Sequence, residues 1–199
     1  MYSLIRPALI LFVLLSAITG VIYPLATFAI AQVAFRAQAN GSIVVRGGKP
    51  VGSALIGQSF DAPRYFQGRP SATAPVPYDA MASGGSNLGP SNPALIDTVK
   101  HRLAALHAAN PDAPGAVPSE LAMASASGLD PDLSSWAALW QVPRVARARG
   151  LPLAQVRELI ARHTQPPSLG LFGEPRVNVL ALNLALDDVR PGVEDNPRR

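Results

Sequence analysis

The sequence predicts an α+β protein, in which one N-terminal transmembrane helix is followed by a small mixed domain with a short β section and then several helices. Three observations support this fold class. Residues 7–35 are apolar and carry no charge, residues 37–93 are rich in Gly, Pro, Ser and Ala around short β-like runs, and from Asn92 onward apolar residues recur at helical spacing. The predicted organisation is a short segment 1–6, a transmembrane helix 7–35, a soluble domain 36–190 and a flexible tail 191–199.

The composition supports a membrane-anchored protein and disfavours several other classes. Only 15% of the 199 residues are charged, against about 25% in soluble globular chains. The net charge is +4, but the basic residues are scattered rather than clustered on one face, so nucleic acid is not an expected partner. The absence of Cys excludes disulfides and thiolate metal sites.

The apolar run at residues 7–35 exceeds the ~20 residues that a helix needs to cross a bilayer. Backbone polar groups must be paired in lipid, so the run must be helical. The alternative is a cleaved signal peptide, with Arg6 as its basic start and Ala29-Ile30-Ala31 as its cleavage site. A signal core has only about 7–15 apolar residues, which favours the uncleaved anchor.

Within this helix, Ser16, Thr19 and Gly20 form a strip of small residues, the kind of surface by which membrane helices approach each other. Pro24 removes one backbone hydrogen bond and is expected to bend the helix. We therefore expect Ser16, Thr19, Gly20 and Pro24 to form the helix-packing surface. Arg6 precedes the helix and Arg36, Arg46 and Lys49 follow it, a small difference that leans toward a cytoplasmic C-terminal side. Because long domains translocate largely regardless of charge, the orientation stays open.

The β section is predicted as strands at Ser42–Val45 and Ser53–Phe60, separated at Gly47-Gly48, with "RYFQGRP" (residues 64–70) as a short third strand.

Helices are predicted next. The first begins at Asn92-Pro93, carries an apolar stripe and stops at Asn110-Pro111; the following ones cover residues 118–128, residues 130–150 with a break at Pro143, and residues 151–163. Residues 177–188 fit a strand or a helix. The helix is preferred, with Asn178 as its cap and Val179, Leu182 and Leu186 aligned.

A search for catalytic motifs finds none. Gly48-Lys49 is followed by Pro50 and fails the P-loop pattern, and Gly84-Gly85-Ser86 does not continue as a nucleophile elbow. The three His residues form no cluster with acidic residues, so no metal site and no catalytic residue is predicted.

A few polar residues have two interpretations. Gly84 and Gly85 are expected to supply positive φ angles in a tight turn that leads into the helix at Asn92, whose N-terminus could also attract an anion. Gln141 is expected to cap the turn broken at Pro143. Arg144 either interacts with the dipole at a helix C-terminus or contributes to a phosphate site. Trp136 and Trp140 lie on one helical face and are expected to pack in the interior.

Several blocks together resemble one family over residues 6–188. In order, the chain reads "RPALILFVLLSAITGVIYPLATFAIAQVAF", "GSALIGQSF", "YFQGRPSAT", "SGGSNLGPSNP", "VPSELAMASASGLDPDLS" and "RVNVLALNLALD". This pattern is similar to the C-subunit family (KdpC) of the Kdp potassium-transporting ATPase.

The resemblance implies a non-catalytic subunit of a bacterial complex that imports K⁺ with ATP. The implied partners are a channel-like K⁺ subunit, a P-type ATPase subunit and a small single-span subunit, and K⁺ is handled by these partners. The implied location is the inner membrane, single-pass, with the N-terminus cytoplasmic and the domain periplasmic. The implied role is assembly, together with action as a catalytic chaperone that raises the ATP affinity of the ATPase subunit.

An alternative implied by the family is a cytoplasmic nucleotide-binding regulator, which would contact the ATPase subunit directly. It would use Ser83, Gly84 and Gly85, which match signature loops of ABC transporters in three letters, together with Gln141 as the family's candidate glutamine and Arg144. In general, no stably bound cofactor is expected. ATP is the candidate ligand of this alternative.

Overall fold

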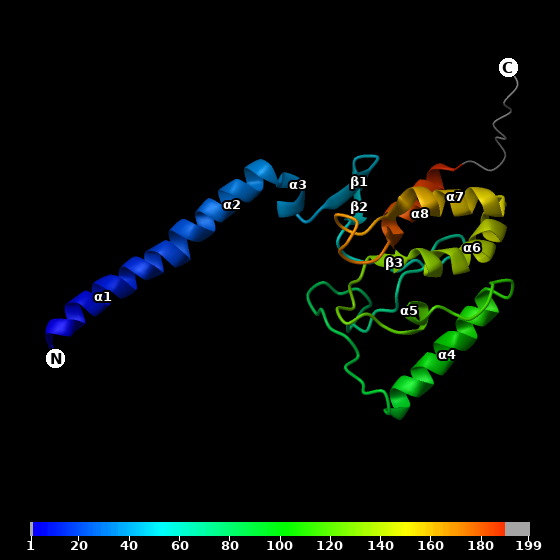
Figure 1. Ribbon diagram of the computed structural model, residues 1–199, viewed down its shortest axis with the longest axis horizontal. Helices are drawn as coiled ribbons and strands as arrows, with labels where there is room; N and C mark the ends of the chain where they lie inside the picture. Colours follow the sequence, from blue (N-terminus) through cyan, green and yellow to red (C-terminus); the bar gives the residue numbers. More distant parts are fainter. Residues whose placement is uncertain (1, 190–199) are drawn as a thin grey trace, which may run out of the picture. The chain divides into compact units, whose positions relative to one another are not determined.

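The computed structural model describes residues 2–189, and the predicted tail at 191–199 lies outside them. The chain divides into two compact units between Val51 and Gly52. The mixed fold confirms the predicted α+β class, with one apolar N-terminal helix and a region of short strands and several helices (Figure 1).

The first unit is dominated by a nearly continuous helix. It consists of α1 (Tyr2–Ala17), a π-helical segment η1 (Ile18–Ile22) and α2 (Tyr23–Ala34), followed by the short α3 (Arg36–Ala39). Residues Leu4–Ala34 have a mean hydropathy of 2.4 over their most apolar window. This helix is long and apolar enough to cross a membrane.

The π segment ends two residues before Pro24 and explains how the helix accommodates this residue. The amide of Tyr23 donates to the carbonyl of Ile18, five residues earlier instead of four. A wider turn relieves the clash between a proline ring and the carbonyl four residues before it. The structure thus shows a local π turn before Pro24, and the bend at Pro24 stays a prediction.

A two-stranded hairpin follows, made of β1 (Ile43–Arg46) and β2 (Lys49–Ser53). Gly47 and Gly48 have φ angles of +57° and +76°, the signs that a type I′ turn requires and that glycine tolerates best. The first predicted strand is confirmed to within one residue.

The second predicted strand, Ser53–Phe60, is wrong, because β2 ends at Ser53. The amide of Gly57 donates to the carbonyl of Leu129 at 2.8 Å. A Cβ at Gly57 would lie 2.5 Å from the carbonyl oxygen of Asp130. This segment therefore packs against a distant loop rather than pairing as a strand.

The second unit contains a small antiparallel sheet of β3 (Asp132–Ser134), β5 (Arg176–Asn178) and β4 (Thr164–Gln165), in the order β3-β5-β4. Val177 is opposite Leu133 on one side and Thr164 on the other. Strands of two or three residues carry no readable alternation, so the sequence did not predict this sheet.

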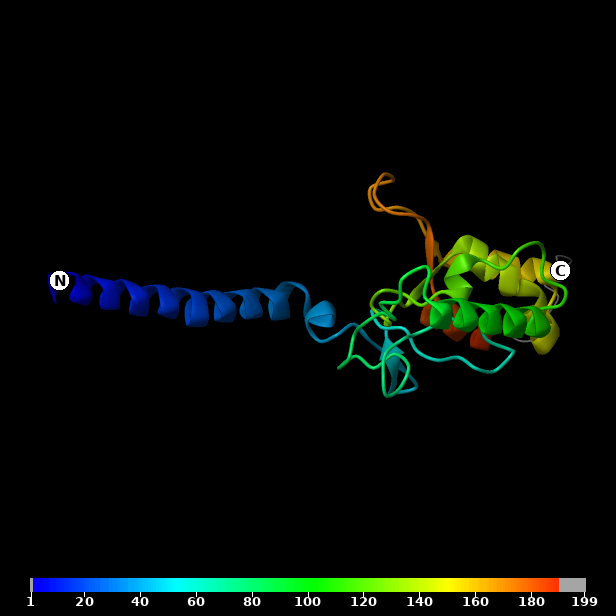
Figure 2. The same ribbon diagram turned by 90° about the horizontal axis from the view of Figure 1, so that it is seen from below.

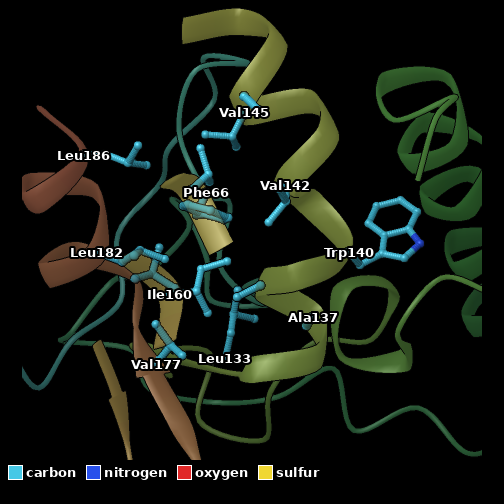
Figure 3. Packing of buried hydrophobic residues seen from close by; sticks show 14 of the residues in the cluster. Phe66, Leu133, Ala137, Trp140, Val142, Val145, Ile160, Val177, Leu182 and Leu186 are labelled. Carbon is cyan, nitrogen blue, oxygen red and sulfur yellow. The ribbon is translucent and has the colours of Figure 1, made fainter. Parts of the chain in front are cut away.

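Three helices surround the core of this unit: α6 (Ser135–Arg149), α7 (Leu153–His163) and α8 (Val179–Asp188). Figure 3 shows Phe66 among residues of α6 and α8, with Ile160 of α7 close by. Phe66 is fully buried although it belongs to a loop. The helices and the small sheet thus pack around the extended loop segment that contains Phe66.

The preference for a helix near the C-terminus is confirmed from Val179 onward, and Val177 and Asn178 belong to β5. The side chain of Asn178 accepts from the amide of Ala181 at 3.0 Å, which confirms it as the cap. Val179, Leu182 and Leu186 are buried together.

Two other helix predictions need correction. The helix predicted from residue 130 begins at Ser135, with Ser134 as its cap, and it is not broken at Pro143. Pro143 has no N–H to donate to the carbonyl of Leu139, and Leu139 is an exposed residue. The residues on either side of Pro143, Val142 and Arg144, are buried. Tertiary packing thus outweighs the ~3 kcal/mol that an internal proline costs. The helix predicted at 118–128 shortens to α5 (Ser119–Ala122).

The helix predicted at Asn92 is confirmed as α4 (Pro93–Ala109), with the Asn92 side chain accepting from the amide of Ala94 at 2.9 Å. Its apolar stripe is only half-buried, and none of its residues is buried. Trp140 of α6 is buried and faces α4, where its ring lies edge-on to His107 (Figure 3). Trp136 is exposed, so the expected packing role holds for Trp140 alone.

Candidate functional site

The membrane-length helix carries an open notch at its predicted packing strip. A Cβ added at Gly20 would meet no heavy atom within 4 Å. The hydroxyl of Thr19 donates to the carbonyl of Leu15 at 2.8 Å, so this polar group is satisfied within the helix. Such a surface lets another helix approach without leaving a polar group unpaired.

In the second unit, two buried carboxamides hold one extended segment. Gln141 of α6 accepts from the amide of Gln67 at 2.9 Å and donates to its carbonyl at 3.0 Å. Asn183 of α8 does the same with Phe66, at 2.8 and 2.9 Å. Each amide therefore replaces the two hydrogen bonds that a neighbouring strand would supply. We call this arrangement the carboxamide clamp.

Arginines extend the clamp toward the start of the segment. Arg144 donates to the carbonyls of Pro63 and Tyr65 at 2.6 and 3.0 Å and to Gln141 at 2.7 Å. A further bond of 3.1 Å reaches the side-chain oxygen of Asn110. Arg149 donates to the carbonyl of Arg64 at 2.7 Å. Four side chains from α6 and α8 thus hold residues 63–67.

The guanidinium of Arg144 is buried, and none of its hydrogen-bond partners among the described residues is a carboxylate. Burial lowers the pKa of Arg144 to about 10, so the group remains charged at neutral pH. A buried charge is tolerated here because four neutral oxygens accept from it.

The clamp corrects two sequence-based expectations. Residues 64–70 are not a third strand, because side chains rather than another strand satisfy their backbone. Gln141 does not cap a broken turn, since α6 is continuous and the Gln141 side chain is 1% exposed and bonded to Gln67. Sequence reasoning also missed Asn183 and Asn110, whose only signal was a polar side chain within or next to an apolar helical pattern.

The second group of predicted site residues lies in a loop that packs against residues 125–128. The amide of Gly84 and the hydroxyl of Ser83 both donate to the carbonyl of Ser127, at 2.8 and 3.0 Å. A Cβ at Gly85 would lie 3.1 Å from the carbonyl oxygen of Ala126. Small residues here allow two loops to lie in contact.

The expected positive φ angles at Gly84 and Gly85 are wrong. In this loop the residue with a positive φ is Asn87, at +52°. Glycine is favoured at position 85 because the backbone of Ala126 approaches closely, and not because position 85 has a positive φ.

Among the hydrogen bonds described for residues 2–189, the loop group (Ser83, Gly84 and Gly85) and the helix group (Gln141 and Arg144) have no partner in common. Ser83 and Gly84 bond to Ser127, whereas Gln141 and Arg144 bond to the clamped segment and to Asn110.

A cleft of about 480 Å³ lies between α4 and the clamped segment. Its lining includes Arg102, Leu106, Gln67, Arg69 and Tyr78. Most of its polar groups already have partners. Arg69 pairs with Asp130 at 3.1 Å, and Arg102 donates to the carbonyl of Ala122 at 3.1 Å. Burial, with smaller contributions from Asp130 and Asp61, raises the pKa of the Tyr78 hydroxyl, which donates to the carbonyl of Arg69.

A shallower hollow beside β3 is lined by the acidic residues Glu120, Asp130, Asp132 and Glu174 and by Arg176. Burial raises the pKa of Asp132, and the hydrogen bond from Asn178 and the charge of Arg176 oppose this effect only in part. Within residues 2–189, no three His, Cys, Asp or Glu side chains are grouped so as to hold a metal ion.

These features define a class: a small α+β domain that follows one membrane-length helix and uses its buried polar side chains to fix its own loops. The comparisons with known proteins narrow the class. A family model described as "K+-transporting ATPase, c chain" (KdpC) matches residues 5–188.

Three relatives agree in their names, each being called potassium-transporting ATPase KdpC subunit. The protein from Variovorax paradoxus is 64% identical over 187 residues, covering 94% of this chain and 97% of its own length. The one from Polaromonas naphthalenivorans is 61% identical over 96% of this chain and 97% of its own length. The one from Sorangium cellulosum is 59% identical over 96% of this chain and its full length. The chain belongs to the KdpC family, which confirms the resemblance found in the sequence.

Proposed function

We propose that this protein is a non-catalytic accessory subunit of a high-affinity, ATP-driven potassium import complex, needed for its assembly and stability. The observation that carries the proposal is the family match over nearly the whole chain, together with relatives named as subunits of a potassium-transporting ATPase. The structure supports it in a second way, since Gln141, Arg144 and Asn183 serve to hold the fold together.

In this proposal the chain crosses the bacterial inner membrane once, with its N-terminus in the cytoplasm and its domain in the periplasm. A channel-like subunit conducts K⁺, a P-type ATPase subunit hydrolyses ATP, and a small single-span subunit completes the complex. The membrane-length helix packs against the channel-like subunit through Ser16, Thr19, Gly20 and the π turn before Pro24.

A leucine at Gly20 tests this packing. The added side chain would fill the notch and keep a partner helix away, so Gly20→Leu should reduce recovery of the partner subunits when the complex is purified through this chain in mild detergent. Ala29→Leu is the matched control, because nine residues at ~100° each place it on roughly the opposite face. Equal recovery of the partners with Gly20→Leu and the wild type would contradict the proposed packing.

The proposal has a second part, in which the subunit raises the ATP affinity of the ATPase subunit by coupling across the membrane. Complexes from which this chain is stripped after purification should then show a higher KM for ATP in their K⁺-stimulated ATPase activity than intact complexes do. The alternative, direct nucleotide contact in the cytoplasm, is less well supported. Gln141 and Arg144 already use their hydrogen-bonding groups within the clamp, and a nucleotide would have to displace these bonds. Binding of labelled ATP to the purified full chain would favour that alternative.

A further inference from the structure

The segment between β4 and β5, residues 166–175, projects from the second unit as a narrow loop (Figure 2, orange). Its tip carries three large apolar side chains in solvent: Leu169 is 94% exposed, Leu171 77% and Phe172 63%. Residues 166–173 carry no charge. We call residues 168–172 the apolar tip. Single exposed apolar residues are ordinary on protein surfaces, but three within four positions on a projecting loop are typical of an interaction site.

The apolar tip has a defined conformation. Ser168 and Phe172 form an antiparallel bridge, in which each amide donates to the other carbonyl, at 2.8 and 2.9 Å. The amide of Gly170 donates to the carbonyl of Pro167 at 2.9 Å. The base is fixed as well, because Gln165 and Arg176 pair across β4 and β5 next to the buried Val177.

The residue at the apex is unfavourable for folding. Leu169 has a φ of +55°, a left-handed conformation that glycine and asparagine adopt far more readily than leucine. Folding alone would thus select Gly or Asn at this position. A leucine that is both strained and almost fully exposed is better explained by a contact that its side chain makes outside the chain.

The charge and the conformation of the loop favour binding to a pocket on a protein over binding to a lipid surface. Protein segments that bind lipid surfaces usually combine apolar residues with Lys or Arg, whereas the single charge in residues 166–175 is Glu174. A fluid bilayer places no demand on backbone conformation, so it gives no reason for a strained, hydrogen-bonded tip. A shaped pocket rewards such preorganisation, because less freedom is lost on binding.

We propose that the apolar tip inserts into an apolar pocket on a partner subunit of the transport complex, with Leu169, Leu171 and Phe172 as its anchors. This inference rests on the proposed function, since it takes its partner from that complex. It adds a second attachment point, on the soluble domain, to the one in the membrane.

The test uses a variant whose effects on folding and on binding have opposite signs. Leu169→Asn relieves the left-handed strain, so the free chain should be at least as stable as the wild type. Combined with Phe172→Ser, it should reduce retention of the partner subunits by at least about tenfold, as loss of a buried anchor does. Met81→Asn is the matched control, since Met81 is 96% exposed in another loop. Retention equal to that of the wild type would overturn the inference.

Photo-crosslinking identifies the molecule that the apolar tip contacts. With p-benzoylphenylalanine at position 171 of the full chain in native membranes, we expect a covalent adduct with a partner subunit. An adduct with lipid alone, or no adduct, would overturn the inference. Its failure is distinguishable from failure of the proposed function. If the wild type binds its partners and Gly20→Leu releases them while the tip variants stay bound, only the role of the tip is lost. If the wild type recovers no partner subunit, both are lost.

Discussion

At the scale of single residues, the main finding is that buried amides replace a strand. Gln141 and Asn183 bond to residues 74 and 117 positions away in the chain. The sequence does show a polar residue within an apolar helix. It does not show which backbone groups that residue will meet, because the partner is chosen by tertiary packing and not by local spacing. This explains why Gln141 was assigned to a helix break and Asn183 was missed.

Loss of the Gln141 amide should be costly. In Gln141→Leu the amide and carbonyl of Gln67 lose their partner inside the protein, and Arg144 loses one acceptor. Each buried polar group left unpaired costs about 1–3 kcal/mol. We expect the free energy of unfolding of the full chain in detergent to fall by about 2 kcal/mol or more, measured by chemical denaturation. Gln155→Leu, at an exposed position of α7, is the matched control and should change stability little. Equal effects of both variants would contradict the clamp.

Asp132 makes the stability of the fold depend on pH. Its pKa is raised above 3.8 in the folded state by burial, so the folded protein holds this proton more tightly than the unfolded chain does. Its contribution to stability is therefore present below pH 3.8 and is lost as the pH rises through the folded pKa. Asp132→Asn removes this dependence. The unfolding free energy of the variant, relative to that of the wild type, should be higher at pH 7 than at pH 4. Denaturant titrations at both pH values measure the difference, and an opposite trend would contradict the assignment.

At the scale of elements, the sequence predicted what local chemistry controls. The caps Asn92 and Asn178, the glycine turn at 47–48 and the apolar faces of the helices follow from side-chain chemistry and spacing. The short strands β3, β4 and β5 do not, since they exist only where helices and loops bring them together. The continuity of α6 through Pro143 is likewise a tertiary effect, as are the loop contacts of Gly57 and Gly85.

The two asparagine caps should differ in their effect on stability. Asn178 caps α8 and also donates to the carbonyl of Ala54 at 3.0 Å and to Asp132 at 3.2 Å, and it is buried. Asn92 caps α4, in which no residue is buried. Asn92→Ala should cost about 1 kcal/mol, as loss of a helix cap does. Asn178→Ala should cost more, because buried partners also lose their bonds. Unfolding curves of the two variants give the comparison, and a larger cost for Asn92→Ala would contradict this account.

At the scale of the whole molecule, one chain combines a membrane-length helix with a domain whose core is built mainly from α6, α7, α8 and the clamped segment. Family membership was predictable from the sequence because its characteristic blocks extend over nearly the full length. The side of the membrane was not, since the flanking charges differ only slightly and a long domain crosses the membrane largely regardless of them.

The absence of cysteine in the chain allows a direct test of orientation. Met81→Cys places a single thiol at an exposed site in the domain. If the domain is periplasmic, a membrane-impermeant maleimide should label this thiol in intact spheroplasts, and permeabilisation should add little. Ser3→Cys, just before the apolar stretch Leu4–Ala34, should be labelled only after permeabilisation. The reverse pattern would place the domain in the cytoplasm and make direct contact with ATP possible.

The carboxamide clamp also determines how the cleft below α4 can change its width. The clamped segment ends at Gln67, which lines the cleft together with Gly68 and Arg69, while Arg102, Leu106 and Ala109 of α4 line its other side. The clamped side is held by buried amides and guanidinium groups, whereas the α4 side is a helix without a buried residue. One side of the cleft is thus held by buried side chains, and we expect a change in its width to involve movement of α4.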